Sequence, residues 1–311
     1  MKVLITGGAG YLGSILTGEL LSHGYEVDVV DRLNYGDSGV RPYKHLRNYR
    51  FHRFDVRDQY KLGEVVSQVD VVVHLAALVG ESLCQDRKRD ATSVNVDGTR
   101  IVAEQCRKHG KPLVFASTCS NYGVTEDYAD EDSPLNPKGL YAETKVAGEK
   151  IVSELDNYVI LRFATLFGVS PRMRLDLMLN EWTTQLMDEG FIDIYQPEAC
   201  RPILNVKDAA KTIWRVIGTL PWQTGVTYNV GVDEFNFTKR ELVEIIRNEV
   251  GGEIVYVDKG DPRNYKVNFS KLNAVLPIVD PITPYVGVNL VKKYLNSAPN
   301  TSRCYNREGY Q

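Results

Sequence analysis

The chain has 311 residues, of which 43% are hydrophobic and 25% charged, and its formal net charge is -3 at pH 7. This composition is typical of a soluble globular protein, and the small negative charge argues against a DNA- or RNA-binding protein. The five cysteines are scattered, so we expect free thiols in a reducing compartment and no metal site. Neither a secretory leader nor a run of roughly 18 apolar residues is recognisable, so we expect a cytoplasmic protein that does not cross a membrane.

Short apolar runs rich in β-branched residues alternate with longer amphipathic stretches. The runs are at 3–5, 27–30, 71–73, 113–115 and 159–161. Their continuous apolarity is typical of strands that are buried on both faces of a parallel sheet. The stretches 12–24 and 97–110 have helical periodicity, and each ends in a Gly suited to stop a helix. This alternation predicts an α/β fold with a doubly wound parallel sheet of the Rossmann type.

The pattern loosens after about residue 165, where longer loops rich in Pro and Arg begin. We therefore expect an NAD-binding Rossmann domain over residues 1–165, with its sheet completed by segments from about 200–235. Residues 166–295 are expected to form mostly a smaller C-terminal substrate-binding lobe, interleaved with the sheet because no linker composition separates them. The polar tail 296–311 lacks periodicity, and we expect it to be mobile or to pack on a neighbouring subunit.

The first predicted strand runs directly into the sequence TGGAGYLG, in which Gly7, Gly10 and Gly13 are spaced three apart. Glycine here permits a tight turn and the close approach of a pyrophosphate, and the helix that follows supplies N–H groups. Asp31 ends the second predicted strand, at the separation expected of a carboxylate that binds the adenosine ribose. This carboxylate favours NAD over NADP, whereas the neighbouring Arg32 is either a receptor for a 2′-phosphate or a surface charge.

Tyr141 and Lys145 are four residues apart in a helical pattern and so lie on one helical face. A nearby ammonium lowers the pKa of a tyrosine from about 10 toward the operating pH, so the pair predicts a general base. The segment PLVFASTCSNYG is a buried strand that ends in hydroxyl residues at the ligand-binding edge of the sheet. Ser117, Thr118 and Ser120 are therefore candidates to bind a substrate hydroxyl or oxyanion, although small polar residues also simply end strands.

Several motifs stand in one order along the chain: TGGAGYLG, Asp31, FDVRD, HLAALVG, NVDGT, ASTCSNYG, YAETK, RFATLFG and a late DPRNY. Together they resemble the extended short-chain dehydrogenase/reductase family, of the NAD-dependent nucleotide-sugar epimerase/dehydratase type, over nearly all of residues 1–275. The resemblance implies a catalytic Thr118, Tyr141 and Lys145. Tyr141 would take the proton of a sugar hydroxyl, commonly at C4, and Lys145 would tune it and orient the nicotinamide ribose. Thr118 would bond the reacting oxygen, and the enzyme would be a homodimer.

The resemblance also implies two sets of binding residues. Those expected at NAD are Gly7, Gly10, Tyr11, Leu12, Gly13, Asp31, Arg32, Asn34, Asp55, Val56, Leu75, Ala76, Ala77, Asn95, Ser117, Tyr141 and Lys145, with Asn95 steadying the central helix. Those expected at a nucleotide-diphosphate sugar are Thr118, Cys119, Ser120, Thr165, Asn180, Arg172, Arg174, Arg201 and Arg263. Arginine suits phosphate through its bidentate fork, and any single arginine is equally well a solvated charge or part of an internal ion pair.

Dehydratases of this type place an Asp and a Glu just after the catalytic Thr, where this chain has Cys119 and Ser120. The departure disfavours 4,6-dehydration and favours an epimerase that forms a keto intermediate and then returns the hydride. Cys119 is either an acid/base group or, more simply, a buried structural thiol. The alternatives are a 4-dehydrogenase or reductase with net redox change, a non-catalytic dinucleotide-binding regulatory protein, and an NADP-dependent reductase of small carbonyl compounds. The sequence does not indicate which nucleotide or which sugar is bound.

Overall fold

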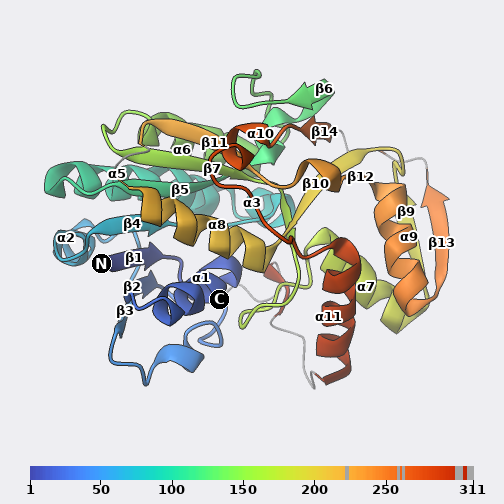
Figure 1. The fold of residues 1–311 in the computed structure, drawn as a ribbon, viewed down its shortest axis with the longest axis horizontal. Helices are drawn as coiled ribbons and strands as arrows, with labels where there is room; N and C mark the ends of the chain where they lie inside the picture. Colours follow the sequence, from blue (N-terminus) through green and yellow to red (C-terminus); the bar gives the residue numbers. More distant parts are fainter. Residues whose placement is uncertain (221–223, 258–259, 261–262, 298–303, 307–311) are drawn as a thin grey trace.

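A seven-stranded parallel sheet forms the larger part of the computed structural model, which describes residues 1–220, 224–257, 260, 263–297 and 304–306 (Figure 1). The strand order is β11-β7-β5-β4-β1-β2-β3, and every neighbouring pair is parallel. The strands are β1 (Lys2–Thr6), β2 (Glu26–Asp31), β3 (Tyr49–Arg53), β4 (Val71–His74), β5 (Leu113–Thr118), β7 (Tyr158–Phe163) and β11 (Val226–Val230). The predicted doubly wound sheet is confirmed, and each of the five apolar runs is one of its strands.

Helices cover both faces of this sheet. On one face lie α1 (Tyr11–Ser22) and α8 (Val206–Thr219), which pack on each other in the core that contains Val3 and Ile5 of β1. On the other face lie α2 (Gln59–Ser67), α5 (Gly98–His109) and α6 (Leu140–Val152), in the core that contains Leu4. Successive side chains of a strand point to opposite faces. Each strand therefore needs apolar residues at nearly every position, which explains the continuous runs in the sequence.

A smaller lobe is built mainly from the second half of the chain and lies to the right of the sheet in Figure 1. Its helices α7 (Met178–Glu189), α9 (Lys239–Val250) and α11 (Pro284–Ser297) pack on one another. Its small sheets pair β9 (Phe191–Tyr195) with β13 (Glu253–Val257), β6 (Val124–Ala129) with β14 (Asn264–Val267), and β10 (Cys200–Asn205) with β8 (Thr165–Phe167) and β12 (Asn236–Thr238). Short helical segments complete the described chain: η1 (Arg41–Tyr43), α3 (Glu81–Asp86), α4 (Lys88–Thr92), η2 (Ser93–Asp97), η3 (Cys119–Tyr122), η4 (Asp233–Phe235) and α10 (Ser270–Asn273).

The segments expected to complete the central sheet do so only in part. β11 joins it beside β7, but β10 pairs with β8 in the separate three-stranded sheet. After β7 the Ala164 N–H donates to the Val230 carbonyl, and the chain then leaves the central sheet and continues as β8, the partner of β10. The edge strand β3, with the sequence YRFHR, was not predicted because its polar residues hide the apolar ones.

The described part of the C-terminal tail packs on its own chain. The Leu175 N–H donates to the Cys304 carbonyl at 2.8 Å, and Asn306 Nδ2 donates to the Val79 carbonyl at 3.1 Å. Cys304 is buried in an apolar cluster with Tyr11. Residues 304–306 are therefore held by their own chain, and packing of the tail on a neighbouring subunit stays a prediction. Residues 298–303 and 307–311 lie outside the described chain.

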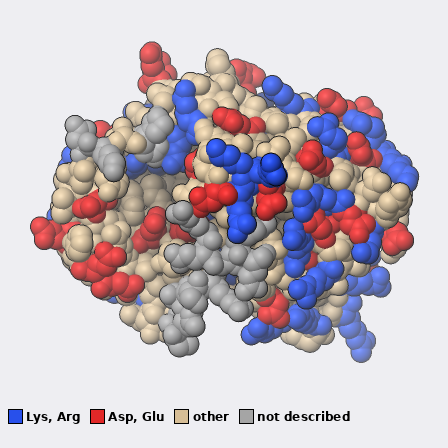
Figure 2. Space-filling view, turned by 180° about the vertical axis from the view of Figure 1, so that it is seen from behind, with Lys and Arg blue, Asp and Glu red and all other residues tan. Residues whose placement is uncertain are grey.

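Acidic and basic side chains are interspersed on the face of the molecule shown in Figure 2. Basic side chains are more numerous toward the right of that view, but acidic side chains lie among them. This face therefore carries no extended field of one sign. Within the described ranges, no helix combines the length and the apolarity needed to cross a bilayer.

Candidate active site

A cavity of about 1060 Å³ lies at the carboxyl ends of the central strands. Residues at or just after the ends of β1, β2, β4 and β5 line it from the side of the sheet, and α7 and β10 line it from the lobe. The strand order reverses at β1, because β2 lies on one side of it and β4 on the other. Doubly wound folds bind their ligands in the crevice at this point of reversal.

Most of the predicted site residues line this cavity. Of the predicted NAD contacts, the lining includes Gly7, Gly10, Tyr11, Leu12, Gly13, Asp31, Arg32, Asn34, Asp55, Val56, Leu75, Ala76, Ala77, Ser117, Tyr141 and Lys145. Of the predicted substrate contacts, it includes Thr118, Ser120, Thr165, Arg172, Arg174, Arg201 and Arg263. The structure does not bring Asn95, Cys119 or Asn180 to the cavity wall.

The glycine-rich loop offers backbone donors in a space that side chains would fill. Gly7 has φ +73°, and a Cβ on it would lie 2.7 Å from the Ala76 nitrogen. A Cβ on Gly13 would lie 2.5 Å from the Gly7 carbonyl oxygen. Gly10 is the N-cap of α1, and none of the described side chains caps that helix. The first N–H groups of α1 are thus available to an anion, which fits the diphosphate of NAD.

Asp31 is held in place by backbone donors at the edge of the cavity. Its two carboxylate oxygens accept hydrogen bonds from Ala9 N at 3.1 Å and from Leu33 N at 2.8 Å. Burial raises the pKa of Asp31, and these hydrogen bonds oppose the rise. Arg32 forms an ion pair with Asp55 at 2.9 Å. This arrangement fits the ribose hydroxyls of NAD better than a 2′-phosphate, which would face Asp31 and an arginine that already has a partner.

A carboxylate from α3 caps the helix that carries Tyr141. The two oxygens of Glu81 accept hydrogen bonds from Leu140 N at 2.9 Å and from Tyr141 N at 3.1 Å. A negative charge at this position stabilises the N-terminus of a helix. The preceding Gly139 has φ +110°, and a Cβ there would lie 2.4 Å from the Glu81 carboxyl carbon. Glu81 thus fixes the start of α6, and nothing in the sequence pattern indicates this role.

Asn95 lies behind the cavity in η2, a turn of π-helix. Its side chain accepts from Leu78 N at 2.7 Å and donates to the Leu78 carbonyl at 3.0 Å and to Thr144 Oγ1 at 3.0 Å. Asn95 therefore links the loop after β4 to α6. The predicted direct contact with NAD is corrected, because these three hydrogen bonds use the amide, while the expectation that Asn95 steadies a central helix fits this geometry.

Burial dominates the electrostatics of Tyr141 and Lys145. Lys145 Nζ lies 4.1 Å from the centroid of the Phe115 ring. Burial lowers the pKa of Lys145 to about 7, while the charge of Glu149 opposes the shift. Burial also raises the pKa of Tyr141, and the cation that opposes this rise is Arg174. Because that opposing charge comes from Arg174, the tuning of Tyr141 by Lys145 stays a prediction.

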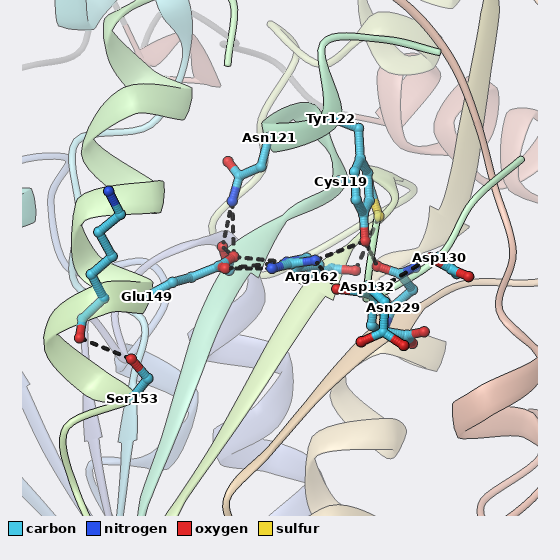
Figure 3. Close-up of polar contacts among 12 residues, drawn as sticks. Cys119, Asn121, Tyr122, Asp130, Asp132, Glu149, Ser153, Arg162 and Asn229 are labelled. Atoms are coloured by element: carbon cyan, nitrogen blue, oxygen red, sulfur yellow. Dashed lines mark hydrogen bonds and ion pairs between the residues drawn. The ribbon is translucent and has the colours of Figure 1, made fainter. Parts of the chain in front are cut away.

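Glu149 and Arg162 form a buried ion pair beside the end of β5 (Figure 3). Arg162 Nη2 lies 2.8 Å from Glu149 Oε2, and Arg162 Nη1 donates to the Tyr122 hydroxyl at 2.9 Å. Ser117 Oγ donates to Glu149 Oε1 at 2.5 Å, and Asn121 Nδ2 donates to the same oxygen at 2.8 Å. Burial alone would lower the pKa of Arg162, but the hydrogen bonds and charge of Glu149 raise it. The Ser117 hydroxyl is thus engaged in this network, while Ser117 also lines the cavity, and its contact with NAD stays a prediction.

Asn180 serves the loop after β8. Its Oδ1 accepts from Gly168 N at 3.0 Å, and its Nδ2 donates to the carbonyls of Arg174 at 2.8 Å and Gly168 at 3.2 Å. The side chain is fully buried. Its predicted substrate contact is corrected, because the amide is used to shape the loop that carries Arg172 and Arg174.

Two of the predicted substrate arginines have partners at the cavity wall. Arg174 Nη2 lies 2.8 Å from Asp176 Oδ2. Arg201 Nη1 donates to the Cys200 carbonyl at 2.7 Å, and its guanidinium lies 5.3 Å from the centroid of the Tyr265 ring. Both side chains are buried and line the cavity, so their charges remain close to any ligand there.

Cys119 is a structural thiol. Its side chain is fully buried, and Sγ donates to the Arg162 carbonyl at 3.1 Å. Burial raises the pKa of the thiol, which opposes formation of a reactive thiolate. The predicted substrate contact of Cys119 is corrected, and the interpretation as a buried thiol fits the geometry. All five cysteines are free and buried, and the described residues contain no cluster that would hold a metal ion.

Replacement of Cys119 by Ala is therefore expected to leave turnover within about threefold of the wild type. The cavity it leaves should cost about 1 kcal/mol of stability. Steady-state kinetics and thermal unfolding of the full chain would check both values. A loss of kcat beyond a hundredfold in a variant of unchanged fold would restore an acid/base role for this thiol.

Glu149 was not identified from the sequence, although its spacing from Tyr141 and Lys145 indicates it. Tyr141, Lys145 and Glu149 are spaced four apart on α6, so they share one helical face. The same spacing that identified the first two indicates the third. Glu81, in contrast, reaches the site only because α3 contacts α6.

The chain matches a family model described as the NAD dependent epimerase/dehydratase family over residues 3–231. That range includes the glycine-rich loop, Asp31, and the three residues Thr118, Tyr141 and Lys145. The chain belongs to this family. It is therefore an NAD-dependent enzyme of the epimerase/dehydratase type, as the motif order predicted.

Relatives with two different reactions resemble the chain over most of its length. It is 31% identical over 268 residues to a dTDP-glucose 4,6-dehydratase of Streptomyces niveus, covering 81% of this chain and 78% of the relative. It is 30% identical over 308 residues to a UDP-glucose 4-epimerase of Halalkalibacterium halodurans, covering 89% and 90%. The solved structure of DesIV, a dTDP-glucose 4,6-dehydratase of Streptomyces venezuelae with NAD bound, matches with a TM-score of 0.85 at 25% identity, covering 96% of this chain and 98% of that chain. These similarities establish the family, and the choice of reaction depends on the site.

Proposed function

We propose that this protein is an NAD-dependent nucleotide-sugar epimerase that inverts a sugar carbon, C4 in the first instance, through a keto intermediate. The observation that carries the proposal is the chemistry of the segment that follows β5. Thr118 and Ser120 line the cavity, whereas Cys119 between them is buried outside it. The elimination of water needs an acid and a base beside the sugar. This segment presents hydroxyl groups to the cavity and no carboxylate, which supports redox chemistry at one carbon without dehydration.

Each of the three catalytic residues has a defined task in this proposal. Tyr141 takes the proton of the reacting sugar hydroxyl and later returns it. Thr118 Oγ1 accepts a hydrogen bond from Ser120 N at 3.1 Å, so its own O–H is available to donate to the sugar oxygen. Lys145, buried on the same helix face as Tyr141, supplies a cation and a donor for the nicotinamide ribose. When bound, NAD supplies the acceptor and donor of the hydride, and a positive charge when it is oxidised.

The nucleotide diphosphate of the substrate would lie on the side of the lobe. Arg201 of β10 and Arg263 line the cavity from that side. Arginine recognises phosphate through a planar pair of N–H groups, and such contacts suit a charged diphosphate more than a small neutral carbonyl compound. These residues support a nucleotide-sugar substrate and leave the identity of the base open.

The proposal is tested by incubating the purified full chain with a panel of UDP-, dTDP-, GDP- and CDP-hexoses and following the products by NMR and mass spectrometry. We expect an isomer of unchanged mass, with no net formation of NADH. A product that has lost water would make the protein a dehydratase. A keto sugar formed together with NADH would make it a 4-dehydrogenase, and no turnover of any substrate would favour the regulatory alternative.

A further inference from the structure

Arg172 is a buried arginine whose guanidinium lacks a complete set of hydrogen-bond partners. The residue is 2% exposed, and its Nε and Nη2 atoms have no hydrogen-bond partner among the described residues. Its guanidinium carbon lies 4.2 Å from the centroid of the Tyr35 ring. The buried arginines Arg162 and Arg174, in contrast, each pair with a carboxylate. A buried cation with unused donors is costly unless an anion reaches it.

The surroundings of Arg172 place it in the dinucleotide half of the cavity. Two residues before it, Ser170 Oγ donates to the Tyr11 carbonyl at 2.7 Å and lies 2.8 Å from Ser14 Oγ. Tyr11 Oη in turn donates to the Gly168 carbonyl at 2.6 Å. The loop that carries Arg172 is thus tied to the first turn of α1, whose N–H groups have no side-chain cap.

Electrostatic interactions place Arg172 close to Asp31 as well, at the adenosine side of the cavity. The charge of Arg172 lowers the pKa of Asp31 at the end of β2, against the larger effect of burial, and the Tyr35 ring follows the same strand. Burial, followed by the nearby charge of Arg174, lowers the pKa of Arg172 itself to about 10. Arg172 therefore stands near both the amino end of α1 and Asp31, between which the diphosphate and the ribose of a dinucleotide would lie.

We propose that Arg172 binds the diphosphate of NAD, opposite the N–H groups of α1. This assignment differs from the substrate contact expected from the sequence, and it rests on the proposed function only in requiring that NAD occupies this cavity. The two nitrogens without partners, Nε and Nη2, lie on one planar guanidinium and match two oxygens of a diphosphate. The lobe arginines Arg201 and Arg263 remain for the diphosphate of the substrate.

The test compares the full-length wild type with Arg172→Met, which keeps an unbranched side chain and removes the charge. Arg100→Met is the matched control, because Arg100 is exposed on α5 and does not line the cavity. Dissociation constants for NAD, ADP and adenosine are measured by calorimetry on protein freed of bound nucleotide. We expect Arg172→Met to raise the dissociation constants of NAD and ADP about 10- to 100-fold, as for the loss of a charge-assisted hydrogen bond. The dissociation constant of adenosine should stay within about threefold of the wild-type value. The control should change none of the three.

Two results would overturn the proposal. One is unchanged affinity for NAD and ADP together with weaker binding of UDP, dTDP, GDP or CDP. That result would show that Arg172 binds the substrate, as expected from the sequence. The other is a uniform loss for ADP and adenosine, which would indicate a merely structural role. If Arg172→Met does not fold, Arg172→Lys is used, because it keeps the charge. We expect Arg172→Lys to weaken the binding of ADP more than that of adenosine, by a factor smaller than the one expected for Arg172→Met. Failure of the epimerase proposal would leave this comparison unaffected, because it uses no sugar substrate.

Discussion

Replacement of Tyr141 by Phe is expected to lower kcat by about 10²- to 10⁴-fold, the usual contribution of a positioned general base. Phenylalanine keeps the ring in the half-buried site and removes only the hydroxyl that exchanges a proton with the sugar. The helix should remain intact, because Glu81 caps α6 through backbone N–H groups that the substitution does not change. The loss should therefore appear in kcat, while the NAD content of the purified protein stays at the wild-type value.

The measurement is steady-state turnover of the nucleotide sugar identified by the substrate panel, together with the amount of NAD released on denaturation. Tyr195→Phe is the matched control, because Tyr195 also lines the cavity but lies on β9 in the lobe. Its kcat should stay within about threefold of the wild type. A Tyr141→Phe enzyme with nearly full turnover would show that another group moves the proton.

Replacement of Glu149 by Gln is expected to destabilise the protein by about 3 to 5 kcal/mol, because it leaves the Arg162 guanidinium buried without its counter-charge. Arg162 is 6% exposed and Glu149 also 6%, so water cannot replace the lost carboxylate charge. For a chain of this size the fall in Tm should be roughly 10 °C. Activity should also fall, because Glu149 accepts a hydrogen bond from Ser117, the residue that directly precedes Thr118.

Thermal unfolding by calorimetry checks this expectation. Glu143→Gln makes the same change at an exposed position of α6 and should shift stability by no more than about 0.5 kcal/mol. The double variant Glu149→Leu with Arg162→Met removes both charges. Its loss of unfolding free energy should be smaller than the sum of the losses of the two single variants, Glu149→Leu and Arg162→Met. A Glu149→Gln protein as stable as the control would mean that the ion pair contributes nothing to the fold.

Some features of this protein are determined by the sequence because each depends on residues close together in the chain. The apolar runs predict the strands, since burial on both faces requires apolar residues at successive positions. The glycine spacing predicts the loop before α1, since only glycine leaves room there for a backbone close to a ligand. The spacing of Tyr141 and Lys145 predicts their shared helical face, and both side chains line the cavity.

Other features were decided by tertiary structure, because they depend on which distant segments meet. Ser117, Thr118 and Ser120 line the cavity, but the Ser117 hydroxyl donates to Glu149. The Cys119 thiol donates to the Arg162 carbonyl, away from the cavity. No local pattern distinguishes these four small polar residues. Likewise, Asn95 was predicted to touch a ligand, but its amide is used by Leu78 and Thr144. A polar side chain takes the partner that the fold brings within hydrogen-bond distance, and the sequence alone does not contain that distance.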